Sequence, residues 1–260
     1  MRITDLQKNW DDLGEVDPFW AILAYPEQQG NKWDRDEFFA TGRTQVDEVL
    51  ATVATACGEP ASTAYAVDFG CGAGRLTLGL ARHYDRVSGV DIAPSMIELA
   101  NELNSLPQRV DYRLNERPDL SLLPDQSVDF LLSIVVLQHM SNDLKRSYLA
   151  EFVRILRPGA TAAFTIPSHA DWSPIGMLRR LPNPIQNIYR RWRHGYSAVM
   201  EMHLMRRREV EAVLQAHGAI VEHVEEESMA GPPFTSYLYV IRRPHSSMEG
   251  TATRAPRQGT

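Results

Sequence analysis

Apolar runs of strand length alternate with longer stretches of helical periodicity from about residue 62 to residue 243. In the clearest helical stretch apolar residues recur at intervals of three or four, and Pro158-Gly159 follows as a stop signal. Such alternation predicts a mostly parallel sheet with helices on both faces. The predicted strands are Ala64–Gly70, Arg86–Asp91, Arg109–Asn115, Val128–Val135, Ala160–Pro167, Ala219–Glu226 and Phe234–Ile241. The helices predicted between the earlier strands are 75–84, 94–104 and 142–156.

The link between the last two predicted strands is the short segment MAGPP. It cannot hold a crossover helix, because a parallel connection needs about a dozen residues or more. We therefore expect the last two strands to pair antiparallel at the edge of the sheet.

Two segments flank this alternating core. Residues 36–56 place apolar residues on one helical face, and the segment before them is dense in aromatic residues. The segment after the core has no apolar periodicity, which predicts a disordered tail. The expected organisation is an aromatic and helical lid at 1–61, a core domain at 62–243 with an insertion at 172–208, and a tail at 244–260.

The composition restricts the class of protein. The chain has 260 residues, of which 43% are hydrophobic and 23% charged. These values suit one domain with appendages and exclude collagen-like, coiled-coil and wholly disordered chains. The net charge of −6 gives no general attraction to nucleic acid or to an anionic membrane.

The cysteines and the N-terminus indicate a compartment. Cys57 and Cys71 are the only cysteines, so the chain has no disulfide framework and suits a reducing environment. The acidic N-terminus lacks the basic flank and apolar run of a signal peptide, and no stretch approaches the ~20 apolar residues that span a bilayer. We expect a soluble, cytoplasmic protein without an integral membrane segment.

A glycine-rich turn joins the first predicted strand to a helix in AVDFGCGAGRLTLGLA. Gly70, Gly72 and Gly74 let the backbone approach a ligand closely, and a helix N-terminus supplies free N–H groups. Glycines also serve tight turns without any ligand, so the loop alone does not decide between the two uses.

Two acids beside this loop favour a ligand. Asp91 ends the next strand, where a carboxylate accepts hydrogen bonds from a ribose diol. A loop that binds NAD would want a third glycine at position 75, which is Arg75 here. Asp68 lies within the first strand, and its carboxylate suits a cationic ligand better than a pyrophosphate. Dinucleotide binding is therefore disfavoured.

Four stretches together resemble the successive motifs of class I S-adenosylmethionine (SAM)-dependent methyltransferases, in a small-molecule, type 11/25-like form. They are VDFGCGAGRLTLGLA, GVDIAPSMIELA, LNERPDLSLLPDQSVDFLLSIVVLQHM and LRPGATAAFTIPSH, in order and spacing over residues 62–243. The resemblance implies an α/β, Rossmann-like, doubly wound sheet of seven strands in the order 3-2-1-4-5-7-6. Its last inserted strand would be antiparallel, and SAM would be the cofactor.

The resemblance also implies roles for the glycine loop and the acids. Gly70, Gly72 and Gly74 match the loop that wraps the methionine part of SAM, and Asp68 matches an acid near its amino group. Asp91 matches the acid that binds the ribose.

Further positions are implied around the adenine and the sulfonium. Ile92 matches a contact on the adenine face, and Ser133 and Ile134 match positions that border the sulfonium. Asn115 and Glu116 fall where a polar residue often lies near the adenine amino group, although the familiar Asp is absent. A strand-end Asn is also a common turn former.

His139 follows the fourth predicted strand in VVLQHM, at the end of the sheet where open α/β folds bind ligands. A histidine poised near neutral pH is the usual base for a hydroxyl acceptor, so His139 is the leading candidate, with packing or helix capping as the alternative. His169, Glu201 and His203 are further candidates. Glu201 and His203 lack a third metal ligand, and we predict no metal.

The aromatic N-terminal segment is expected to complete the site as a lid. Trp20, Trp33, Phe38 or Phe39 over the cofactor would exclude water from the transfer site. Arg43 in FFATGR would then reach the cofactor carboxylate, unless it is only a solvated helix residue.

The insertion at 172–208 is expected to select the acceptor, because it resembles the variable substrate cap of this fold. Its arginines favour a carboxylate or phosphate partner, and its apolar residues favour a bulky or acyl-bearing one. A solvated helical face or a homodimer contact is the alternative. The arginines are Arg179, Arg180, Arg190, Arg191, Arg193, Arg206, Arg207 and Arg208.

The leading hypothesis is a SAM-dependent methyltransferase that acts on a small-molecule acceptor, at a hydroxyl or carboxyl oxygen of an anionic or amphipathic metabolite. An RNA or protein methyltransferase, a non-catalytic SAM-binding regulator and an NAD-dependent oxidoreductase are the alternatives. The acidic composition argues against nucleic acid as a partner. C-, N- and S-methylation share the same cofactor half, so the sequence leaves the acceptor atom open.

Overall fold

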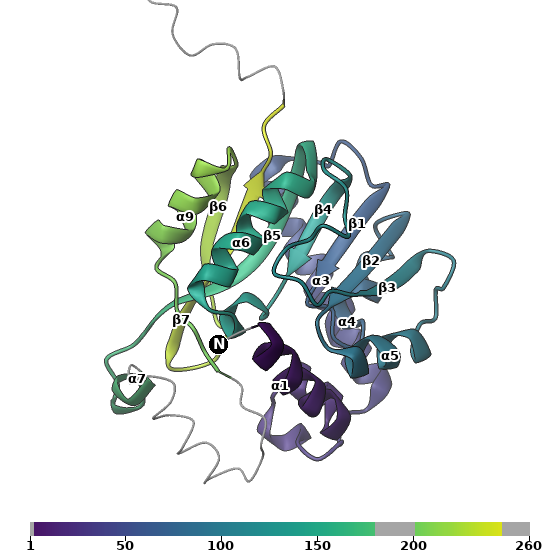
Figure 1. Cartoon of the computed structure of the whole chain (residues 1–260), viewed down its shortest axis with the longest axis vertical. Helices are drawn as coiled ribbons and strands as arrows, with labels where there is room; N and C mark the ends of the chain where they lie inside the picture. The colour runs from purple at the N-terminus through teal and green to yellow at the C-terminus, as the bar shows by residue number, and fades with distance from the viewer. Residues whose placement is uncertain (1–2, 180–200, 246–260) are drawn as a thin grey trace, which may run out of the picture.

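A seven-stranded sheet forms the centre of the computed structural model, which describes residues 3–179 and 201–245 (Figure 1). Its strands are β1 (Tyr65–Phe69), β2 (Arg86–Asp91), β3 (Val110–Leu114), β4 (Val128–Ser133), β5 (Leu156–Ala170), β6 (Ile220–Glu227) and β7 (Phe234–Arg242). The strand order is β3-β2-β1-β4-β5-β7-β6. β1 to β5 are parallel, and β7 runs antiparallel to both β5 and β6. The predicted fold is confirmed.

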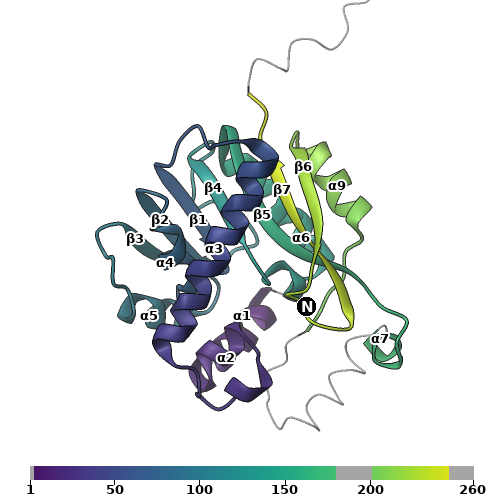
Figure 2. The same ribbon diagram turned by 180° about the vertical axis from the view of Figure 1, so that it is seen from behind.

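Helices cover both faces of this sheet. They are α1 (Ile3–Val16), α2 (Pro18–Ile22), α3 (Arg35–Cys57), α4 (Arg75–Leu80), α5 (Pro94–Glu102), α6 (Asn142–Ile155), α7 (Pro174–Arg179) and α9 (Arg207–Ala216), with short 3₁₀ helices η1 (Pro26–Gln28) and η2 (Leu137–His139). α6 and α9 lie on one face (Figure 1). The long helix α3 crosses the other face with α4 beneath it (Figure 2).

The alternation of side chains along the strands builds one core on each face. Val67 of β1 and Leu131 of β4 pack in the cluster that includes α6 and α9 residues. Their neighbours Ala66, Phe130 and Leu132 pack in the cluster that includes α3 and α4 residues. A parallel strand buried on both faces reads as a continuous apolar run, which is why β4 is VDFLLS with every residue buried.

The antiparallel pair lies at the end of the sheet, as the short link predicts. β7 is inserted between β5 and β6, so that β6 alone forms this edge. The register pairs Phe164 of β5 with Tyr239 of β7, whose rings stack with centroids 5.4 Å apart. The resulting strand order places the link after β6 at the same end of the sheet as the loops after β1 and β4.

α1 and α2 lie at the end of the sheet where the parallel strands end (Figures 1 and 2). Asp11 of α1 accepts a hydrogen bond from the backbone N–H of Ser95 at 2.8 Å, which ties α1 to the start of α5. Asp34 is the N-cap of α3, and its carboxylate accepts from the N–H of Glu37 at 3.0 Å. Within the described parts of the chain, no helix is long and apolar enough to cross a membrane.

Candidate active site

A large cavity of about 1790 Å³ opens at the carboxyl ends of the strands. Open α/β sheets bind ligands at this end, because the loops after neighbouring parallel strands meet there. The wall comes from α1, α2 and the part of α3 between Glu37 and Thr52, from the loops after β1, β2 and β4, and from the link between β6 and β7. The cavity therefore joins the sequence motifs of the core to both flanking regions.

The glycine-rich loop forms part of this wall through Gly70 and Gly72, while Gly74 lies behind it. All three glycines have positive φ, at 78°, 50° and 86° in chain order. A Cβ on Gly72 would lie 2.6 Å from Ile22 Cδ1 of α2, and one on Gly74 would lie 2.1 Å from the hydroxyl of Tyr112. Both the backbone conformation and the space therefore require glycine here.

Asp91 lies in the wall directly beside this loop. Its Oδ2 accepts from the N–H of Gly72 at 2.8 Å, and its Oδ1 accepts from the N–H of Ala93 at 3.0 Å. Burial raises the pKa of Asp91, and these backbone hydrogen bonds oppose that rise. Each carboxylate oxygen keeps a second lone pair for a ligand, which fits a ribose diol in the cavity.

Asp68 is placed differently from the acid that the resemblance implies. It is 1% exposed and is not part of the cavity wall. Its Oδ2 accepts from the hydroxyl of Thr77 at 2.6 Å, and its Oδ1 has no hydrogen-bond partner among the described residues. Burial raises its pKa to about 7. Asp68 thus lies beneath the glycine loop, and a role near the amino group of SAM stays a prediction.

At the predicted adenine end, Ile92 and Asn115 line the cavity and Glu116 does not. The side-chain amide of Asn115 donates to the carbonyl of Asp119 at 2.9 Å and so holds the turn after β3. Glu116 accepts from Gln7 of α1 at 2.8 Å. Asn115 therefore forms a turn, as the alternative to ligand binding proposes, while it also faces the cavity.

The end of β4 carries a strained residue. Ser133 is buried outside the wall, and its hydroxyl has no partner among the described residues, whereas Ile134 lines the cavity. Val135, also in the wall, has φ 63°, which is rare for a β-branched residue. Its N–H donates to the hydroxyl of Thr165 at 2.8 Å. This bond from β5 holds the turn in place.

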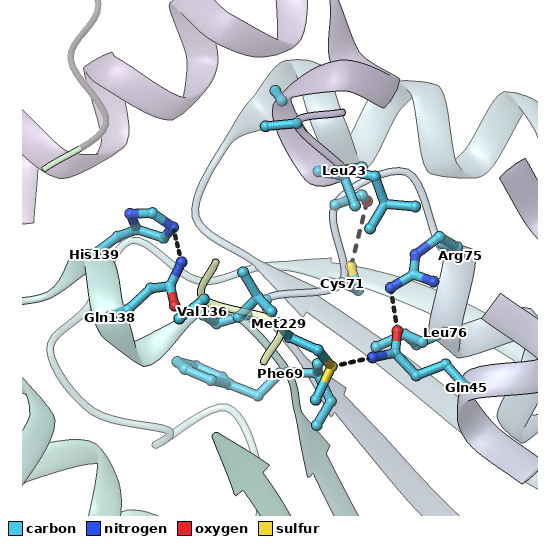
Figure 3. Close-up of a pocket in the computed structure, with 18 of the residues that line it drawn as sticks. Leu23, Gln45, Phe69, Cys71, Arg75, Leu76, Val136, Gln138, His139 and Met229 are labelled. Carbon is cyan, nitrogen blue, oxygen red and sulfur yellow. Dashed lines mark hydrogen bonds between the residues drawn. The ribbon is translucent and has the colours of Figure 1, made fainter. Parts of the chain in front are cut away.

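His139 lies on η2, is 6% exposed and lines the cavity. Its Nδ1 is 2.8 Å from the carbonyl oxygen of Glu201, which only accepts, so Nδ1 carries a proton. Its Nε2 lies 3.1 Å from Nε2 of Gln138 (Figure 3). Trp10 of α1 packs against the imidazole with ring centroids 4.8 Å apart. Sequence reasoning missed Trp10, because nothing local ties it to His139.

The arginine in the described wall is Arg75, whereas Arg43 is exposed and lies outside the wall. Arg75 is 5% exposed and donates to the hydroxyl of Thr41 at 3.1 Å and to the amide oxygen of Gln45 at 2.6 Å (Figure 3). Among the described residues its Nε has no hydrogen-bond partner, and its two hydrogen-bond acceptors are neutral. Burial lowers its pKa to about 10, although the carboxylate of Asp68 opposes this shift from a distance. A buried cation whose hydrogen-bond partners are neutral fits an anionic ligand group.

The aromatic residues of the N-terminal region divide between the cavity and a core. Trp20 lines the cavity together with Trp10. Phe38 and Phe39 instead pack with Trp33 in a small core behind the wall. The expectation that one of four aromatic residues faces the cavity thus holds for Trp20 alone.

The described cavity wall carries several acidic side chains. The carboxylates beyond Asp91 are Glu37, Glu48, Glu225, Glu226 and Glu227. His169 is exposed on β5 and outside the wall, and Glu201 pairs with His203 at 3.0 Å. No group of three metal-binding side chains occurs in residues 3–179 and 201–245. Residues 180–200 and the side chain of Arg179, which include most of the predicted arginine cluster, lie outside the described residues.

Comparison with known proteins adds the following findings. A family described as "Methyltransferase domain" matches residues 67–164. Ajmaline N-methyltransferase from Rauvolfia serpentina is 31% identical over 112 residues, covering 42% of this chain and 38% of that protein. Ubiquinone biosynthesis O-methyltransferase from Xanthomonas campestris pv. campestris is 30% identical over 153 residues, covering 56% and 58%. The chain thus spans about half the length of the curated relatives it matches.

Solved structures share the fold at low sequence identity. Magnesium protoporphyrin IX methyltransferase from Synechocystis PCC 6803, solved with bound SAH, superposes with a TM-score of 0.63 at 15% identity, over 93% of this chain and 99% of that one. A putative sarcosine dimethylglycine methyltransferase from Galdieria sulphuraria gives 0.57 at 16% identity, over 81% and 88%. The family match covers the glycine loop, Asp91 and His139, and leaves out α1, α3 and the link between β6 and β7.

Proposed function

Since the chain belongs to the class I SAM-dependent methyltransferases, we propose that it transfers the methyl group of SAM to a small-molecule acceptor held in the cavity at the strand ends. One observation carries the proposal most strongly. Asp91, at the end of β2, lies in the cavity wall and is bonded to the glycine-rich loop through Gly72. A carboxylate in this position can accept hydrogen bonds from the hydroxyl groups of a ribose that lies beside the glycine-rich loop.

The residues of the wall suit SAM along its length. We assign the ribose to Asp91, the adenine to the apolar face of Ile92, and the methionine part to Gly70 and Gly72. Arg75 replaces Arg43 as the group that holds the methionine carboxylate, because its guanidinium is buried in the cavity wall and its hydrogen-bond partners there are neutral. When bound, SAM supplies a methyl carbon attached to a positively charged sulfur.

His139 is the proposed general base for a hydroxyl acceptor. Its Nδ1 proton is held by the carbonyl of Glu201, which leaves Nε2 as the basic nitrogen. The acceptor hydroxyl would take the place of the Gln138 amide at Nε2 and give up its proton there as its oxygen bonds to the methyl carbon. The electron pair of the broken carbon–sulfur bond stays on sulfur. The wall must chiefly hold the nucleophile in line, which is worth up to ~7–11 kcal/mol.

The wall also bears on the class of acceptor. Apolar side chains such as Leu76, Val49 and Leu238 line the half of the cavity near α3, which supports an amphipathic acceptor. The anionic character expected from the arginine cluster has no support from the described wall, where Glu225 and Glu226 would repel an anion. We therefore propose an amphipathic acceptor with a methylated oxygen. A product methylated on nitrogen would contradict the proposed oxygen acceptor.

Three broader expectations stay proposals. The division into a lid at 1–61, a core domain and a disordered tail at 244–260 is one of them. Cytoplasmic location is another, supported by the free thiols of Cys57 and Cys71. A homodimer formed through the insertion is the third, and light scattering on the purified chain would test it.

Calorimetric titration of S-adenosylhomocysteine, the product form of SAM, tests the cofactor assignment. We expect the wild type to bind it, Asp91→Ala to lose most of the affinity, and Asp85→Ala to keep it, because Asp85 is exposed and outside the wall. A methyl-transfer screen against a metabolite extract then identifies the acceptor by the mass of its product. Binding of NAD in place of the SAM product would overturn the proposal.

A further inference from the structure

An extended segment that we call the strap, residues 201–205, lies in the last part of the insertion, just before α9. Backbone hydrogen bonds fix it at two points. The N–H of His203 donates to the carbonyl of Gln138 at 2.7 Å, and the N–H of Met205 donates to the carbonyl of Pro167 at 3.0 Å. The strap thus joins η2, which carries His139, to the end of β5.

A buried lysine provides a third anchor. Lys145 of α6 is 0% exposed, and its ammonium donates to the backbone carbonyl of His203 and to the side-chain oxygen of Asn142. The amide of Asn142 in turn donates to the carbonyl of Leu204 at 3.2 Å. Two side chains on the first turn of α6 therefore hold consecutive carbonyls of the strap.

Burying the charged ammonium group of Lys145 costs free energy, because the charge loses its hydration. Burial lowers the pKa of Lys145 to about 7, and the carboxylate of Glu209 on α9 opposes this shift from a distance. The groups that the structure bonds to the ammonium are neutral oxygens. An apolar residue of the same length would avoid the desolvation of a charge, but it would leave the carbonyl of His203 without the donor that Lys145 supplies.

The strap reaches the proposed base. The carbonyl of Glu201 accepts from Nδ1 of His139, two residues before the carbonyl that Lys145 holds. The carboxylate of Glu201 folds back onto the imidazole of His203 at 3.0 Å, which stiffens the segment between them. A displaced strap would remove the acceptor at Nδ1, and the proton of the neutral imidazole would then be free to move to Nε2.

We propose that Lys145 is a positioning residue for His139: it pins the strap so that the Glu201 carbonyl keeps the proton on Nδ1 and the basic lone pair on Nε2. The proposal rests on the function assigned to His139 above. It also couples the insertion to the base, because the strap belongs to that insertion.

The test replaces Lys145 with Met, which keeps the length of the side chain and removes the donor. The matched control is Arg146→Met, the next residue on α6, whose exposed guanidinium pairs with Asp143 at 2.9 Å. Carbon-13 and nitrogen-15 spectra of histidine-labelled protein report the tautomer of His139, with its signals assigned by their loss in His139→Gln. Calorimetry with S-adenosylhomocysteine and steady-state kinetics complete the measurements.

We expect K145M to shift the His139 signals from the Nδ1–H form toward a mixture, and to lower kcat about tenfold or more, within the ~10²–10⁴-fold that a general base contributes. The affinity for S-adenosylhomocysteine should stay within about twofold, because the strap residues that meet Lys145 do not line the cofactor end. The control should change neither the spectrum nor kcat. The pH profile of kcat should shift as well, because Lys145 interacts electrostatically with Glu209 and with the imidazole of His203.

An unchanged His139 tautomer in K145M would overturn the proposal, and so would a loss of kcat matched by an equal loss of cofactor affinity. If K145M does not fold, Asn142→Ala decides, because it removes the neighbouring anchor on Leu204 and should shift the same signals less. The spectral readout needs no methyl transfer. Failure of wild-type transfer would therefore refute the proposed function, while a changed tautomer would still support the positioning role.

Discussion

Replacing Arg75 with Met should weaken the binding of S-adenosylhomocysteine by a calculable amount. The guanidinium is almost fully buried, and within the part of the chain that the structure describes it donates to Thr41 and Gln45 alone. A hydrogen bond to a charged group is worth about 1.5–3 kcal/mol, and each 1.4 kcal/mol is a factor of ten in affinity. One carboxylate bound at Arg75 therefore predicts a loss of roughly tenfold to somewhat over a hundredfold.

The same substitution should leave the fold stable. Burial lowers the pKa of Arg75 from 12.5 to about 10, which corresponds to roughly 3 kcal/mol against the charged form. Met has a similar reach and no charge, so R75M removes this cost in the absence of ligand. Chemical unfolding should show a free energy equal to or above that of the wild type.

The assay measures the affinity of two ligands for two variants, R75M and R43M. S-adenosylhomocysteine carries the carboxylate, and 5′-methylthioadenosine lacks it. R75M should weaken only the former, and R43M should change neither, because Arg43 is exposed outside the wall. Equal loss of both ligands in R75M would show a merely structural role. Selective loss of S-adenosylhomocysteine in R43M would restore the expectation from the sequence and refute the assignment to Arg75.

Three further predictions concern the base, the buried acid and the lid. His139→Ala should lower kcat by about 10²–10⁴-fold with the affinity for S-adenosylhomocysteine unchanged, and unchanged turnover would remove His139 from catalysis. Burial raises the pKa of Asp68 to about 7, so its ionisation at higher pH opposes folding. The unfolding free energy of the wild type, relative to Asp68→Asn, should therefore fall by roughly 2 kcal/mol from pH 5 to pH 7, and parallel pH curves would contradict this. Deleting residues 1–35 removes Trp10 and the other α1 and α2 residues of the wall and should weaken the binding of S-adenosylhomocysteine. An unaltered affinity in a folded truncated chain would refute the lid hypothesis.

The fold was predictable because its signals are local. The run VDFLLS specifies a doubly buried strand by itself, and the segment MAGPP excludes a crossover helix whatever surrounds it. The place of Asp91 was predictable for a similar reason. It ends the strand that follows the glycine-rich loop in the chain, so the strand pattern alone puts it beside that loop.

Other parts of the site depend on how elements dock, which periodicity does not encode. The sequence places Arg43, Thr41 and Gln45 within one turn of a helix, but the packing of α3 on α4 decides that the latter two face the cavity. Arg75 was visible in the sequence only as the residue that breaks an NAD-type glycine pattern. Asp68 is likewise visible in the sequence as the second-last residue of β1. The structure is needed to show that its side chain bonds to Thr77 beneath the glycine-rich loop.

The contact of Trp10 with His139 is the clearest case. It joins residues far apart in the chain, and an aromatic residue in α1 has several faces on which to pack. Aromatic density predicted a lid without indicating what each ring meets, and the structure places Trp10 against the candidate base.

The most direct measurement is transfer of an isotopically labelled methyl group from SAM to a component of a metabolite extract, followed by mass spectrometry. We predict a labelled small-molecule product with the wild type, and none with Asp91→Ala at the same SAM concentration. A wild-type chain that binds neither SAM nor S-adenosylhomocysteine in calorimetry and labels nothing would contradict the assignment of this cavity to methyl transfer.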